Sequence, residues 1–115
     1  MTSDHPIRIS PAPDRVRVTW RGRLVAESDA ALELREHTYP PVLYIPRRDA
    51  DMKHFVRSPV ETRRPYKGVA NYFSLVADGA ADKDAVWTYE SPLPGVAAIK
   101  DHLAFYPDRV RIARG

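Results

Sequence analysis

The chain has 115 residues, of which 43% are hydrophobic and 29% charged, and its formal net charge is +3. This length fits a single domain, and the composition is that of a globular protein, which excludes a disordered chain. The absence of cysteine excludes a disulfide framework, a thiolate metal site and cysteine catalysis. No apolar run approaches the roughly 20 residues of a membrane-spanning helix, and the first 13 residues lack the apolar stretch of a signal peptide. We therefore expect a cytoplasmic protein.

Eleven prolines and five glycines divide the chain into short segments. Residues 1–13 hold three prolines and are predicted to form an extended arm, followed by one domain over residues 14–115. Residues 16–20 alternate apolar and polar side chains, which predicts a strand, and residues 24–26 return as its hairpin partner. Residues 32–35 alternate in the same way and predict a further strand, although one helical turn fits part of this window.

The middle of the chain holds two apolar segments and one helical candidate. Residues 42–45 form a short apolar run between prolines, which predicts a strand. Asp49 suits a helix N-cap, so residues 50–56 are predicted to form about two helical turns. In residues 69–76, alternate side chains form two sets that would face opposite sides of a strand. Both sets are fairly apolar, which predicts a strand buried on both faces.

The last third of the chain repeats the pattern of short strands. Residues 86–89, 103–106 and 110–112 are predicted strands, and residues 96–99 a single helical turn. Turns every 8–15 residues are typical of a compact antiparallel sheet fold or a small barrel. The sequence therefore predicts an all-β fold of small antiparallel sheets with one or two short helical turns.

The segment over residues 63–68 has the densest positive charge. Arg63, Arg64 and Lys67 lie next to Gly68, and cations beside a flexible backbone can hold a phosphate or carboxylate. The spacing is not that of a P-loop. The simpler interpretation is a solvated turn, because charged runs usually face water.

Aromatic residues on predicted strands form a second group of candidates: Tyr44, Tyr72, Trp87 and Tyr89. Their rings could line one concave face and direct hydroxyls or an indole N–H at a ligand. The same residues fit core packing and cross-strand pairs equally well.

Signals for catalysis and for metal binding are weak. Glu36 is the preferred general acid or base among the glutamates, because it follows a predicted strand and precedes the turn into Tyr44. The four histidines show no metal-ligand spacing, so no metal and no cofactor is predicted.

Four segments together, residues 38–46, 62–68, 85–89 and 103–106, give the chain a resemblance to the bacterial domain-of-unknown-function family 427. The resemblance spans about residues 16–112, and the family is filed under a nucleotidyltransferase-like label. It implies a compact all-β domain of the β-tent kind and no established activity. No Gly-Ser plus paired-Asp pattern supports nucleotidyl transfer.

Several residues match the family pattern: Glu36, Tyr44, Pro65, Lys67, Gly68, Tyr72, Trp87, Tyr89 and Phe105. The resemblance makes Lys67, Tyr44, Tyr72 and Trp87 pocket candidates and places Phe105 in the core. Relatives commonly carry cysteine where this chain has Arg64, so chemistry that used that thiol would be lost here.

Two functions remain open from the sequence. The first is binding of a small anionic or nucleotide-like ligand, with Lys67 and Arg63 holding the anion, the aromatic rings stacking on the ligand and Glu36 as the base. The alternative is a non-catalytic interaction or dimerisation module that uses edge strands, including a homo-oligomer. Nucleic acid is not expected as a partner, because the basic residues are not gathered into a long block. A membrane is not expected either, because no apolar run is long enough to span one. Whether the protein is an enzyme is left open.

Overall fold

The alternating segments of the sequence form ten β-strands and three short 3₁₀ helices in the computed structural model, which describes residues 7–115. The strands are β1 (Ile7–Pro11), β2 (Val16–Trp20), β3 (Arg23–Ser28), β4 (Leu32–Glu36), β5 (Val42–Pro46), β6 (Phe55–Arg64), β7 (Gly68–Ala77), β8 (Ala80–Thr88), β9 (His102–Phe105) and β10 (Arg111–Arg114). The 3₁₀ helices are η1 (Arg47–Asp49), η2 (Met52–His54) and η3 (Pro94–Ile99). The prediction of an all-β fold is confirmed.

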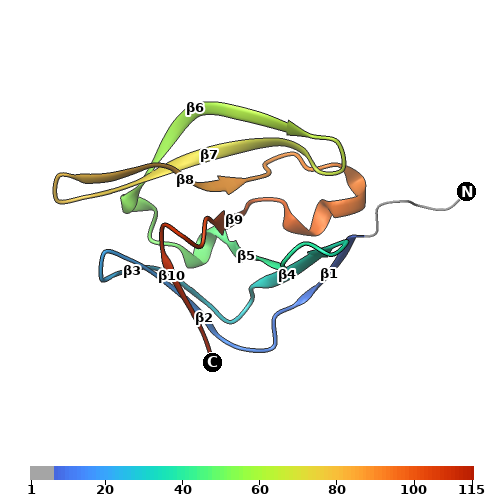
Figure 1. Cartoon of the computed structure of the whole chain (residues 1–115), viewed down its shortest axis with the longest axis horizontal. Helices are drawn as coiled ribbons and strands as arrows, with labels where there is room; N and C mark the ends of the chain where they lie inside the picture. Colours follow the sequence, from blue (N-terminus) through green and yellow to red (C-terminus); the bar gives the residue numbers. More distant parts are fainter. Residues whose placement is uncertain (1–6) are drawn as a thin grey trace, which may run out of the picture.

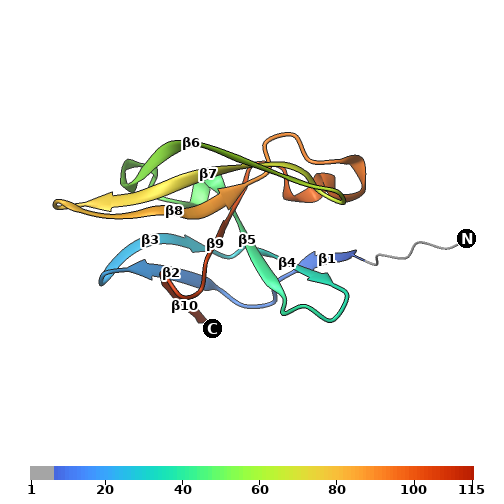
Figure 2. The same cartoon turned by 45° about the horizontal axis from the view of Figure 1, so that its top comes forward.

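The strands form two antiparallel sheets, and neither closes into a barrel. Seven strands pair in the order β1-β4-β5-β9-β8-β7-β6, and three pair in the order β10-β2-β3. Figure 1 and Figure 2 show β6, β7 and β8 in one layer, with β1 to β4 and β10 in the facing layer. The seven-stranded sheet passes from one layer to the other where β5 meets β9, with Ile45 opposite Leu103 and Pro46 opposite His102. Its two ends therefore face each other.

Two clusters of buried side chains fill the space between the layers. The first is built from aliphatic and phenyl groups around Trp20, Phe55 and Phe105. The second is richer in tyrosine and contains Tyr44 and Tyr89. Phe105 is 4% exposed, in agreement with its expected place in the core.

The helix predicted over residues 50–56 is wrong. The region forms two single turns, η1 and η2, and β6 already begins at Phe55. The Asp49 carboxylate accepts a hydrogen bond from Ser28 Oγ at 2.6 Å instead of capping a helix. The backbone N–H of Asp51 donates to the Val25 carbonyl at 2.8 Å, which ties this stretch to β3 and removes a donor that a helix would use.

The predicted extended arm over residues 1–13 is described only from residue 7. Residues 7–11 form β1, which pairs with β4 in register, with Ile9 opposite Leu34. Residues 1–6 lie outside the described part of the chain.

Candidate functional site

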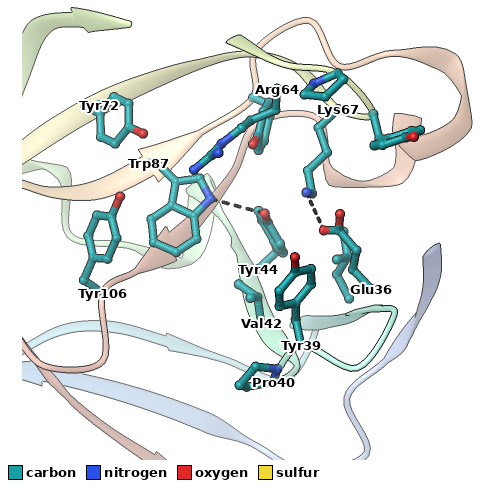
Figure 3. Close-up of a pocket in the computed structure, with 14 residues that line it drawn as sticks. Glu36, Tyr39, Pro40, Val42, Tyr44, Arg64, Lys67, Tyr72, Trp87 and Tyr106 are labelled. Carbon is teal, nitrogen blue, oxygen red and sulfur yellow. Dashed lines mark hydrogen bonds and ion pairs between the residues drawn. The ribbon is translucent and has the colours of Figure 1, made fainter. Parts of the chain in front are cut away.

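A cavity of about 540 Å³ opens between the two layers, on the side of the tyrosine-rich cluster. Its walls come from both layers: β4, β5 and the loop between them on one side, and β6, the β6–β7 turn, β7 and β8 on the other. Figure 3 shows these side chains pointing toward a common space. The lining residues are Leu34, Glu36, Tyr39, Pro40, Val42, Tyr44, Arg64, Pro65, Tyr66, Lys67, Tyr72, Trp87, Tyr89 and Tyr106.

The structure brings together six of the residues singled out in the sequence, and they share this one cavity: Glu36, Tyr44, Lys67, Tyr72, Trp87 and Tyr89. Arg63 is not in the lining, and its neighbour Arg64 is. Successive side chains of a strand point to opposite faces, and Arg63 and Arg64 are the last two residues of β6. Thr62, on the same face as Arg64, contacts Tyr72 Oη at 2.9 Å, which identifies that face as the cavity side.

Lys67 and Glu36 form the polar end of the cavity. Lys67 Nζ donates to Glu36 Oε1 at 2.6 Å, and the two side chains are only 14% and 16% exposed. Glu36 is the last residue of β4, while Lys67 lies in the turn between β6 and β7. The ion pair therefore joins the two layers across the cavity.

Gly68 gives the turn that carries Lys67 its shape. Its φ of +112° is a conformation that side-chain-bearing residues rarely adopt. A Cβ at this position would also lie 3.4 Å from the backbone oxygen of Ser91. The Leu93 N–H donates to the Lys67 carbonyl at 2.8 Å, so the turn is fixed from outside as well.

Aromatic rings form the wall opposite the ion pair. The rings of Tyr44 and Trp87 meet edge to face, with centroids 6.4 Å apart and an angle of 88°. Trp87 Nε1 donates to Tyr44 Oη at 3.2 Å, as drawn in Figure 3. Tyr106 packs against Trp87 with ring centroids 4.6 Å apart. These contacts hold the rings in fixed orientations.

Burial raises the pKa of three tyrosines that line the cavity, Tyr44, Tyr89 and Tyr106. Burial raises the pKa of Tyr44 to about 12. Burial is also the main cause that raises the pKa of Tyr89 and of Tyr106. Each of these phenols therefore keeps its O–H and can donate a hydrogen bond.

Tyr89 stands out among these phenols. It is 3% exposed, yet no described residue forms a hydrogen bond with its hydroxyl. Among the described residues, the one fully enclosed side-chain polar atom without a partner is Asp84 Oδ1. The Tyr89 hydroxyl is therefore open to the cavity and available to a molecule inside it.

Arg64 lines the cavity, whereas the sequence analysis gave the role of holding an anion to Lys67 and to the neighbouring Arg63. The guanidinium opposes the effect of burial by lowering the pKa of Tyr44, Tyr89 and Tyr106. In Figure 3 its side chain extends toward Trp87. Within residues 7–115 no hydrogen bond or ion pair engages this guanidinium.

Tyr106 was expected in a strand but not in the site. Trp87 on β8 lies opposite Ala104 on β9, and Tyr106 follows two residues later on the same side. The alternation was readable from the sequence, but the pairing of β8 with β9 was not.

Two further features bear on the class of protein. The part of the chain that the structure describes contains no group of three or more histidine, aspartate or glutamate side chains placed to hold a metal ion. In the same residues, no helix has the length and apolar character needed to cross a membrane.

Comparison with known proteins identifies one family. The family described as "Domain of unknown function (DUF427)", which carries a nucleotidyltransferase-type label, matches residues 8–114. No curated protein matches the chain.

Proposed function

We propose that this chain, which belongs to the DUF427 family, binds a small anionic or nucleotide-like ligand in the cavity between its two layers. The observation that carries the proposal is convergence. Six candidates scattered from residue 36 to residue 89 line one open space that side chains leave unfilled. A solid interior at this place would have favoured a purely structural role for them.

The size and lining of the cavity support this function. Ligand sites are typically clefts of roughly 300–1,000 Å³ with apolar and aromatic walls and a few convergent polar groups. The cavity has a volume of about 540 Å³ and combines aromatic rings with two cations, one carboxylate and several hydroxyls. An isolated patch of surface cations would lack the enclosing walls.

The Lys67–Glu36 ion pair adds charged hydrogen-bonding groups to the site. Lysine carries three donors, and the bond to Glu36 uses one of them. The ammonium can therefore contact a ligand without giving up its ion pair. We propose binding for this site and assign no reaction to it.

The alternative function is an interaction module that binds its partner by strand addition, and the β6 edge of the large sheet is poorly suited to it. The edge strand β6 carries Pro59, and its register with β7 shifts between Arg57 and Glu61. Proline lacks the N–H that a new strand would need, and bulges of this kind blunt sheet edges. The β6 edge is therefore a poor place for strand addition, and an interaction module would have to use one of the other edge strands, β1, β3 or β10.

A pair of tryptophan substitutions tests the proposal. Val42 lines the cavity, whereas Val56 is 51% exposed on β6. Val42→Trp fills the cavity, and Val56→Trp adds the same bulk outside it. The probes are adenosine monophosphate and a library of small carboxylates and phosphates, with binding followed by ¹H–¹⁵N NMR shifts.

We expect probes that shift the amide signals of cavity residues in the native protein and in Val56→Trp, and not in folded Val42→Trp. Shifts that are confined to other surfaces, or equal in the two variants, would refute the proposal.

A further inference from the structure

The charges that line the cavity do not cancel. The lining contains two cations, Arg64 and Lys67, and one carboxylate, Glu36. Lys67 and Glu36 neutralise each other at 2.6 Å. Among the described residues of the lining, one positive charge remains, and it belongs to Arg64.

Arg64 is also placed as an anion receptor. Its guanidinium is unengaged within the described residues, and it lies near the aromatic wall formed by Trp87 and Tyr44. A guanidinium offers a planar fork of donors that matches a carboxylate or phosphate in two parallel hydrogen bonds. Low-dielectric aromatic walls strengthen such a bond relative to one in open water.

We infer that Arg64, rather than Lys67 or Arg63, anchors the anionic group of the ligand, and that the ligand is a flat aromatic molecule carrying a single negative charge. This inference rests on the proposed binding function and narrows its ligand class. The aromatic ring of the ligand packs against the aromatic wall of the cavity. The carboxylate or phosphodiester of the ligand accepts hydrogen bonds from the Arg64 guanidinium.

The hydroxyls complete the specificity of the site. Tyr89 offers an O–H that no described residue engages, whereas Tyr44 is 1% exposed and its hydroxyl accepts from Trp87. Tyr72 already forms a hydrogen bond with Thr62. The ligand therefore carries an acceptor, such as a ring nitrogen or a carbonyl, that faces Tyr89.

The same charge count disfavours polyanions. A nucleoside triphosphate would bring several negative charges to one uncompensated cation, and Glu36 would lie close to the excess. Uncompensated charge in a partly enclosed site is costly, and like charges repel. The ligand class thus differs from the one that a nucleotidyltransferase-type label suggests.

The two neighbouring arginines supply a matched pair of variants. Arg63 and Arg64 are both exposed and adjacent on β6, but only Arg64 lines the cavity. Arg64→Gln and Arg63→Gln remove the same charge from opposite faces of the strand. Since neither position is buried, both variants are expected to fold, which circular dichroism checks.

The experiment measures dissociation constants for aromatic carboxylates, each paired with its neutral amide; indole-3-acetate with indole-3-acetamide is the first pair. We expect the acid to bind about tenfold or more tightly than the amide, because a charge-assisted hydrogen bond contributes on this scale. Arg64→Gln removes that preference, and Arg63→Gln retains it. Cyclic adenosine monophosphate, with one charge, binds more tightly than adenosine triphosphate.

The outcomes separate this inference from the proposed function. Three results would overturn the role of Arg64 and leave the binding function standing. They are equal affinity of the cavity for acids and amides, an equal loss of the preference for the acid in Arg63→Gln and Arg64→Gln, and tighter binding of the triphosphate than of the cyclic monophosphate. Failure of every acid, amide and nucleotide to shift any cavity amide would overturn both.

Discussion

Lys67 Nζ lies 2.6 Å from Glu36 Oε1, although the two residues are 31 positions apart and belong to facing layers. Both side chains are largely shielded from water, at 14% and 16% exposure. An exposed ion pair contributes little to stability, but removing one partner of a shielded pair leaves an uncompensated charge. This bond therefore both closes one end of the cavity and links the layers.

Lys67→Met is expected to lower the free energy of unfolding by about 1–3 kcal/mol, because Glu36 loses its partner in a shielded place. The double variant Lys67→Met/Glu36→Gln should recover part of that loss. Urea unfolding followed by circular dichroism measures both. The exposed pair Arg57–Glu90, at 2.7 Å, is the control, and Arg57→Met should cost less. Equal losses at the two pairs would contradict the role given to shielding.

The raised pKa of Tyr44 makes stability depend on pH in the alkaline range. In the unfolded chain the phenol ionises near pH 10, whereas burial holds the pKa of folded Tyr44 at about 12. Between these values the unfolded state binds fewer protons, so stability present below pH 10 is lost as the pH rises toward 12. One such tyrosine accounts for up to about 1.4 kcal/mol per pH unit. Tyr44→Phe should flatten the slope of unfolding free energy against pH, and parallel profiles would refute this assignment.

Gly68→Ala is expected to destabilise the protein by about 1–3 kcal/mol, because alanine is strained at a φ of +112°. The new methyl group would also press on the Ser91 backbone oxygen, 3.4 Å away. Gly95→Ala is the matched control, since its φ is not in the left-handed region and no atom lies within 4 Å of its added Cβ. The difference between the two midpoints of urea unfolding isolates the strain, and equal midpoints would show that the turn adapts.

Trp20 joins the small sheet to the large one. Its Nε1 donates to Asp82 Oδ2 at 2.6 Å, and its ring is 1% exposed. Trp20→Phe should cost about 2–4 kcal/mol, from the lost hydrogen bond and the smaller ring. Asp82→Asn keeps an acceptor oxygen and should cost less. An Asn variant as unstable as the Phe variant would show that the charge of Asp82, rather than its acceptor, is what matters.

Strands with a buried face were predictable from the sequence, and strands without one were not. The β2–β3 hairpin and β7 follow clear alternation, with Val16, Val18 and Trp20 buried on one side. β6 was missed because it is an edge strand with exposed residues at most positions, and Pro59 interrupts it where the register shifts. With no face to bury, its sequence carries no two-residue pattern.

The absence of β6 from the predicted strands also explains why the sequence analysis chose Arg63 as a site residue, whereas Arg64 lines the cavity. Which of two neighbouring side chains enters a cavity depends on the phase of the strand that carries them. Without β6 in the prediction that phase was undefined, so the sequence located the charge cluster and not the arginine that faces inward. The aromatic members of the site were easier, because Tyr44, Tyr72 and Trp87 lie on strands whose patterns were clear.

The two tryptophans of the chain occupy contrasting surroundings. Trp20 is sealed in the first core cluster, whereas Trp87 is half-buried in the cavity wall beside Tyr106. Their fluorescence should therefore separate into two signals, one from an indole in a dry interior and one from an indole that senses whatever enters the cavity. On the proposed function, a ligand that enters the cavity is expected to change the emission of Trp87, whereas the emission of Trp20 is expected to change only when the sheets come apart.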